Sequence, residues 1–327
     1  FNALQEGART LIDVMDQTQS PMGARLMKRW MALPLKDIVP INDRLNIVEY
    51  LVEHDDLREE IIPKIKKLGD VERIISRVAA GKVSPREMQQ LKIGLTSFEG
   101  IKEICLSAAD DGILKLGEEM DPCIELRQKI GRELQEDPPA LVNKGNVIAA
   151  GVSAELDELR DIVFSGKDFL RQIQERESER TGIPSLKIGF NNVFGYYIEV
   201  RNTHKDKVPD EWIRKQTLVS AERYITEELK QYEEKILGAE EKILALEANL
   251  FHDLVISVID YISAIQLNAS LTARLDCLLS FALVAIEYQY VRPEVNHSEV
   301  IDIKLGRHPV IERELPVGES YVPNDVF

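Results

Sequence analysis

The chain has 327 residues, enough for two or more domains that each bury a core. Its composition, 44% hydrophobic and 30% charged residues, predicts a soluble globular protein and argues against a disordered chain. A formal net charge of −15 disfavours general binding of nucleic acid, because that binding is driven by Lys and Arg side chains that neutralise phosphates. A polyanion is therefore expected to bind only at a locally basic surface.

The sequence carries no pattern typical of a membrane span, a secretory leader or a disulfide framework. No unbroken apolar run approaches the roughly 18 residues that a bilayer requires, and the first 30 residues lack a basic start and an apolar centre. The three cysteines, Cys105, Cys123 and Cys277, are far apart and have no CxxC spacing, which fits a reducing compartment. We therefore expect a cytoplasmic protein with no membrane contact and no zinc site.

The first half of the chain has the pattern of a helical bundle. Residues 20–32 begin with Ser20 as an N-cap and Pro21 at the first helical position, and apolar residues follow on one face. Further helical patterns occur at about 41–53, 56–67, 69–79, 84–107 and 111–135, with Pro or Gly in several of the breaks. Residues 142–151 predict a short hairpin or crossover. We expect a helical core over residues 1–152.

Two long segments carry the narrow apolar stripe of paired helices. Apolar residues recur at steps of three and four from 153 to about 180, with only Gly166 interrupting them. A second series keeps heptad register at Leu229, Tyr232, Ile236, Ala239, Ile243, Leu246 and Leu250. The other faces are densely charged, so these stripes favour knobs-into-holes packing of two helices. We predict an antiparallel lever formed by residues 153–184 and a returning helix that continues into the core, 226–290.

Residues 185–225, between the two lever segments, break the helical pattern. Apolar residues alternate from Leu186 to Phe190 and from Tyr196 to Val200, which predicts a β-hairpin with a turn near Asn191. Between 185 and 223 seven basic residues face five acidic ones, a net charge of +2 in an acidic chain. On charge alone an ordinary surface over a small β core is favoured. The alternative is a basic β module that contacts a duplex backbone.

The remaining sequence shows no catalytic constellation. Five scattered histidines have no metal-ligand spacing, and neither a G-x-x-x-x-G-K-[ST] phosphate loop nor a G-x-S-x-G elbow occurs. Residues 291–327 change to strand-like sequence with four prolines. We expect them to be the opening strands of a further, incomplete domain.

Five segments together resemble one family. They are TQSPMGARLMKRW (18–30), GDVERI (69–74), SERTGIPSLKIGFNNVFGYYIEV (178–200), QTLVSAERYITEELKQYEEKI (216–236) and GRHPVIE (306–312). In this order they resemble the MutS family of DNA mismatch-repair proteins over essentially the whole chain. The resemblance implies a mainly α fold: a helical core, a long antiparallel lever, a small β-rich clamp (185–225) at its tip, and the start of an ATPase domain (291–327).

The resemblance also implies that the clamp contacts the duplex backbone non-specifically and that the lever and core couple it to the ATPase. The clamp positions that it implies for phosphate contact are Lys187, Asn191, Asn192, Arg214, Lys215, Gln216, Thr217, Ser220 and Arg223. It further implies a partial adenine pocket formed by Tyr321, Val322 and Asn324. The alternative for Tyr321 is an aromatic buried in a strand.

Members of this family are expected to bind mismatched DNA as homodimers, to act with a MutL-type repair partner and to use ATP and Mg²⁺. This chain ends before a phosphate loop and lacks the mismatch-inserting Phe-x-Glu module, so we expect a fragment without ATP hydrolysis or a cofactor of its own. The alternative is a non-enzymatic scaffold whose arm binds protein partners. Salt would distinguish them, because phosphate contacts weaken steeply with salt whereas apolar contacts do not.

Overall fold

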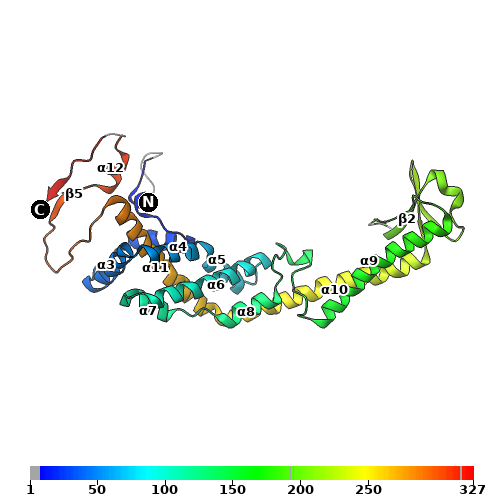
Figure 1. Cartoon of the computed structure of the whole chain (residues 1–327), viewed down its shortest axis with the longest axis horizontal. Coiled ribbons are helices and arrows are strands. Elements are labelled where there is room, and N and C mark those ends of the chain that lie inside the picture. Colours follow the sequence, from blue (N-terminus) through cyan, green and yellow to red (C-terminus); the bar gives the residue numbers. More distant parts are fainter. Residues whose placement is uncertain (1–7, 192, 194, 317–318) are drawn as a thin grey trace. The chain divides into compact units, whose positions relative to one another are not determined.

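The computed structural model describes residues 8–191, 193, 195–316 and 319–327 (Figure 1). The fold is mainly α-helical with a small antiparallel sheet, which confirms the predicted fold class. The chain divides into two compact units. Unit 1 contains residues 1–131 and 255–327, and unit 2 contains residues 132–254.

Unit 1 is a bundle of helices around one buried helix, α11 (Ile262–Tyr288), which packs against α2, α3, α5 and α7. The other helices of the bundle are α1 (Leu11–Met15), α2 (Pro21–Ala32), α3 (Ile38–Glu53), α4 (Asp55–Lys67), α5 (Val71–Ala79), α6 (Pro85–Ser107), α7 (Asp111–Glu119) and α8 (Ile124–Glu133). Local capping explains several of their starts. The Ser20 side chain accepts a hydrogen bond from Gly23 N, as the sequence predicts, and Ser84 forms a capping box with Glu87.

The single helix predicted over 111–135 was wrong, because the chain breaks between α7 and α8. Pro122 lies in the break, and Cys123 has a positive φ of 48° that a continuous helix does not allow. The backbone of Asp121 is bound there by the Asn268 side chain, whose Oδ1 accepts from Asp121 N at 3.0 Å and whose Nδ2 donates to Asp121 O. The break is thus stabilised by a residue far away in the sequence.

A stripe of polar side chains runs along one face of α11, at Asn268, Thr272, Asp276 and Ser280. All four are fully buried. The Asp276 carboxylate accepts from Gln19 N at 2.8 Å, from Ser20 N at 2.9 Å and from the Ser20 hydroxyl at 2.7 Å. Ser280 Oγ accepts from Gln17 N at 2.7 Å. Asn268, Asp276 and Ser280 therefore bind backbone groups of neighbouring loops, and Asp276 attaches the segment before α2 to α11.

The helical run Glu227–Tyr288 is, in the part of the chain that the structure describes, the one helix long and apolar enough to cross a bilayer by length and composition. Its most apolar stretch is 67% buried inside the protein. This burial is typical of the core helix of a globular bundle.

Unit 2 is built on the antiparallel pair of α9 (Ala154–Thr181) and α10 (Glu227–Val258), as predicted (Figure 1). The rings of Phe169 and Tyr232 stack across the pair with centroids 3.7 Å apart. A Cβ atom at Gly166 would lie 2.7 Å from the Ile236 side chain. Gly166 is therefore part of the seam, because Ile236 occupies the space that a side chain at position 166 would need.

One ion pair lies inside this helix pair. Arg160 donates to Glu247, with 2.5 Å between nitrogen and oxygen, and the Glu247 side chain is fully buried whereas Arg160 is 24% exposed. Arg160 also donates to Ile148 O at 2.7 Å, and Glu247 accepts from Val147 N at 3.3 Å. The segment predicted as a hairpin or crossover is thereby held against both helices. It contains a short 3₁₀ turn (Val142–Lys144) and a single bridge between Leu134 and Ile148.

A four-stranded antiparallel sheet follows α9, in the order β1-β2-β4-β3. Its strands are β1 (Lys187–Asn191), β2 (Gly195–Arg201), β3 (Ile213–Thr217) and β4 (Ala221–Ile225). The predicted hairpin is β1–β2, and the second hairpin, β3–β4, was not predicted. Ile198, Val200 and Tyr224 form one buried cluster with helix residues such as Ile173 and Ile236. One face of the sheet therefore packs against the helices.

The C-terminal segment of unit 1 contains β5 (Ile303–Gly306), α12 (Pro309–Glu314) and β6 (Asn324–Val326), and β5 pairs with β6 antiparallel. Strands occur there as predicted. The motif GRHPVIE, however, forms a short helix, because Pro309 occupies the first helical position and the His308 ring accepts from Val310 N and Ile311 N, each at 3.3 Å.

We predict that Asp276→Asn lowers the free energy of unfolding by about 1–3 kcal/mol, because either orientation of the amide turns an NH₂ group toward a backbone N–H donor. The matched control is Thr272→Val on the same stripe. The Thr272 hydroxyl is buried and finds no hydrogen-bond partner among the described residues. Chemical denaturation should show Thr272→Val unchanged or more stable, and an equal loss in both variants would contradict the role of Asp276.

A second prediction concerns the buried ion pair. Arg160→Met should destabilise unit 2 by about 3–5 kcal/mol, because it leaves a buried carboxylate without its counter-charge. Glu247→Met should cost less, since the partly exposed Arg160 can turn toward water. The double variant should recover most of the loss. Native-state hydrogen exchange of α9 and α10 amides measures all three, and additive effects of the two single changes would refute the pairing.

Candidate nucleic-acid interface

The face of the sheet that points away from the helices carries a row of polar side chains. Ile198 and Val200 point to the helix side, so Glu199 between them lies on the opposite face. Across the strands, Glu199 is paired with Lys187 on β1 and with Arg223 on β4. Arg223 is in turn paired with Gln216 on β3. We call Lys187, Glu199, Arg223 and Gln216 the polar row.

Within the polar row, the Arg223 side chain is oriented by contacts with three neighbouring side chains. Its Nε donates to Glu199 Oε2 at 3.0 Å, and one terminal nitrogen donates to Gln216 Oε1 at 2.9 Å. Its guanidinium also lies over the Tyr197 ring, 4.3 Å from the centroid. The guanidinium is thus fixed in direction, while exposed Lys187 ends the row on β1. Such donors at fixed spacing are suited to hydrogen-bonding phosphate oxygens.

Arg214 does not join the polar row, although the sequence placed it among the candidate contacts. It is paired with Tyr224, on the helix side of the sheet, and its guanidinium is 3.3 Å from Glu222 Oε1. Glu222 also accepts from the Tyr224 hydroxyl. Burial, helped by Glu222, raises the pKa of Tyr224 to about 12, and the hydrogen bond from Tyr224 lowers the pKa of Glu222. Arg214 and Tyr224 therefore share one carboxylate that stays charged at neutral pH.

Lys215 lies in the middle of β3, and the remaining described candidates lie at or near strand ends. The register shifts between Arg214 and Gln216, and Lys215 lines an open cavity together with Phe190, Tyr196 and α10. The other candidates have these places: Thr217 is exposed at the end of β3, Ser220 is exposed in the turn before β4, and Asn191 ends β1, where its Oδ1 accepts from Val193 N at 2.8 Å. Asn192 lies outside the described residues.

Sequence reasoning did not select Glu199 or Tyr197 as functional residues. Glu199 could have been selected from the predicted β1–β2 hairpin, because the register of that hairpin sets Glu199 opposite Lys187. The contact of both residues with Arg223 needed the second hairpin, which the sequence pattern did not predict.

The candidate adenine residues lie together near β6. Tyr321 is half-buried and outside any strand, so the alternative of a buried strand aromatic was wrong. Val322 is 75% exposed, and the Asn324 amide donates to Val322 O at 3.2 Å. Among the described residues no group of His, Cys, Asp and Glu side chains is arranged to hold a metal ion. The three cysteines are buried free thiols.

Comparison with known proteins gives the family of the chain. The family MutS domain III matches residues 2–282. The DNA mismatch repair protein MutS of Phocaeicola vulgatus is 62% identical over 327 residues, and that of Bacteroides thetaiotaomicron is 60% identical; each match covers 100% of this chain and 38% of the relative. The MutS protein of Flavobacterium johnsoniae is 57% identical over 327 residues, with the same coverage. The chain spans about 38% of the length of these relatives and belongs to the MutS family of DNA mismatch-repair proteins.

Proposed function

We propose that this chain supplies the part of a mismatch-repair protein that holds the DNA backbone, and that the polar row of the sheet makes the contact. The observation that carries the proposal is the row itself, in which Arg223 is pre-oriented and exposed Lys187 lies across Glu199 from it, on a face turned away from the helices. It lies in a segment, residues 185–223, that has a net charge of +2 in a chain of −15. Contacts of this kind position a duplex and carry no base information.

The acidic remainder of the chain supports a weak, non-specific contact. Each phosphate that is neutralised adds about −0.9 to the slope of log K against log salt, so roughly two or three phosphates give a slope of about −2 to −3. We propose that the remaining candidate positions, Arg214 and Lys215 among them, contribute at the edge of the same module.

The activity of the whole protein is part of the same proposal. We infer that ATP and Mg²⁺ act in a longer protein, that it works as a homodimer with a MutL-type partner in the cytoplasm, and that α9 and α10 transmit the DNA contact. For this chain we propose only the stacking part of a nucleotide site. The partly exposed ring of Tyr321, beside exposed Val322 and the Asn324 amide, fits contact with an adenine base. The phosphates would be held by residues outside these 327.

A protein-binding arm remains the second candidate function. It is favoured by the exposed apolar side chains of Phe190, Val193 and Ile213, which line the cavity beside α10. Binding through them would change little with salt, in contrast to phosphate binding.

We expect Lys187→Ala combined with Arg223→Ala to reduce the salt slope of duplex binding by up to about 2, because each removes about one phosphate contact. The matched control is Lys36→Ala, which removes an exposed positive charge from unit 1. Fluorescence anisotropy with a labelled duplex, between roughly 50 and 200 mM salt, measures the slope. An unchanged slope in the double variant, with its melting temperature preserved, would favour the protein-binding arm.

A further inference from the structure

The sheet is joined to the helices by an apolar cluster and by polar contacts near its edges. On α9, Gln174 Oε1 accepts from Ile188 N of β1 at 2.9 Å, and on α10, Glu233 Oε2 accepts from Tyr196 N of β2 at 3.0 Å. Apolar packing has no preferred direction, whereas these hydrogen bonds do. The side of the sheet that contains β1 and β2 is therefore oriented by both helices.

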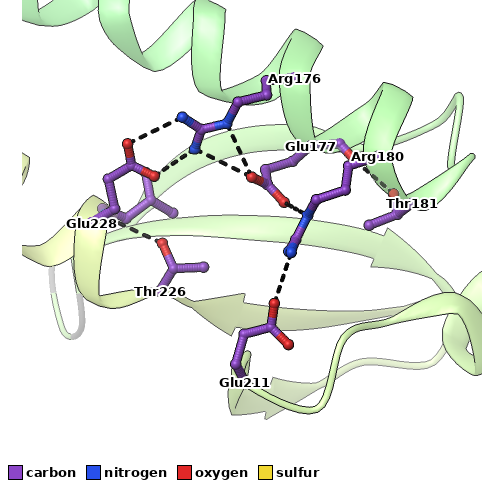
Figure 2. Close-up of polar contacts among 8 residues, drawn as sticks. Arg176, Glu177, Arg180, Thr181, Glu211, Thr226 and Glu228 are labelled. Atoms are coloured by element: carbon purple, nitrogen blue, oxygen red, sulfur yellow. Dashed lines mark hydrogen bonds and ion pairs between the residues drawn. The ribbon is translucent and has the colours of Figure 1, made fainter.

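The opposite edge, at β3, is reached by a charged network at the end of α9 (Figure 2). At its centre is Glu177, whose side chain is only 9% exposed. Its carboxylate accepts from Arg176 Nε at 3.2 Å and from Arg180 Nε at 2.8 Å. Arg176 also donates to Glu228 on α10, with 3.3 Å for one of its two contacts. The buried carboxylate thus holds both arginines in place (Figure 2).

Arg180 extends this network to the sheet. Its terminal nitrogen lies 2.9 Å from Glu211 Oε1 (Figure 2). The backbone N–H of Glu211 and then Arg180 lower the pKa of the Glu211 carboxyl, while Glu211 raises the pKa of Arg180, so both groups stay charged at neutral pH. Glu211 stands two residues before Ile213, the first residue of β3, and Trp212 between them is buried in the apolar cluster.

Strand β3 connects the Arg180–Glu211 ion pair to the polar row. Gln216 on β3 accepts the hydrogen bond from Arg223 at 2.9 Å. A shift of β3 would move Gln216 and release one of the two hydrogen bonds that orient the Arg223 guanidinium. Glu177 and Arg180 are residues of α9, on the side of the sheet that packs against the helices, whereas the polar row lies on the opposite face.

We propose that Arg180, held by the buried carboxylate of Glu177, is a positioning residue for DNA: its ion pair with Glu211 fixes β3 and thereby the direction of Arg223. The inference rests on the proposed function. Removal of the negative charge of Glu211 should therefore weaken the binding of a polyanion, whereas charge alone predicts tighter binding.

The test uses the 327-residue chain and a labelled duplex at low salt. Arg180→Gln and Glu211→Gln should each weaken binding by about three- to tenfold, and the double variant should be no weaker than either, because both break the same contact. The salt slope should stay that of the unaltered chain, since neither side chain meets a phosphate. The matched control is Asp210→Asn, the neighbouring exposed carboxylate, which makes no ion pair among the described residues and whose loss should leave binding unchanged or tighter.

Hydrogen exchange of β3 amides, measured without DNA, gives an independent readout. Exchange should be faster in Arg180→Gln and Glu211→Gln than in Asp210→Asn. The inference is overturned if Glu211→Gln binds as tightly as Asp210→Asn, if the two losses add in the double variant, or if β3 exchange is unaltered. Failure of the unaltered chain to bind duplex in a salt-dependent way would instead refute the proposed function, and this inference with it.

Discussion

Unit 2 depends on the seam between α9 and α10. Both helices are charged on their outer faces, so neither would be stable by itself, and the narrow apolar stripe is what holds them together. At Gly166 the seam has no side chain on one helix and receives Ile236 from the other. The sheet then packs its apolar face on this pair, through Ile173, Leu229 and their neighbours. The direction of the polar row follows from this arrangement.

Buried carboxylates perform three related tasks in this protein. Asp276 binds backbone N–H groups at the start of α2, Glu247 pairs with Arg160 inside the helix pair, and Glu177 holds two arginines beneath the sheet. A buried charge is costly unless it is fully paired, so each carboxylate tolerates few alternative arrangements of its neighbours. Apolar packing supplies most of the stabilisation of such a fold, while these groups select one geometry among those that packing would allow.

The negative net charge of the chain predicts that the proposed DNA contact is weak. The net charge of −15 opposes the approach of a polyanion, and within the polar row Glu199 forms an ion pair with Arg223. The row can therefore orient donors toward a phosphate without binding DNA tightly. The proposed contact is therefore weak and independent of the base sequence.

Local patterns in the sequence determined the helices, the Ser20 cap, the seam and the first hairpin, because each depends on residues within a few turns or strands of one another. Tertiary structure decided the break between α7 and α8, where Asn268 binds Asp121 from 147 residues away, and the attachment of the α2 cap to α11, where Asp276 binds Ser20 across 256 residues. It also decided the polar row. Lys187 and Glu199 meet within one hairpin, but Arg223 and Gln216 come from a second hairpin whose strands are short and mostly polar. Periodicity records which face of an element is apolar, whereas the partner of a buried polar group is chosen only when distant elements pack together.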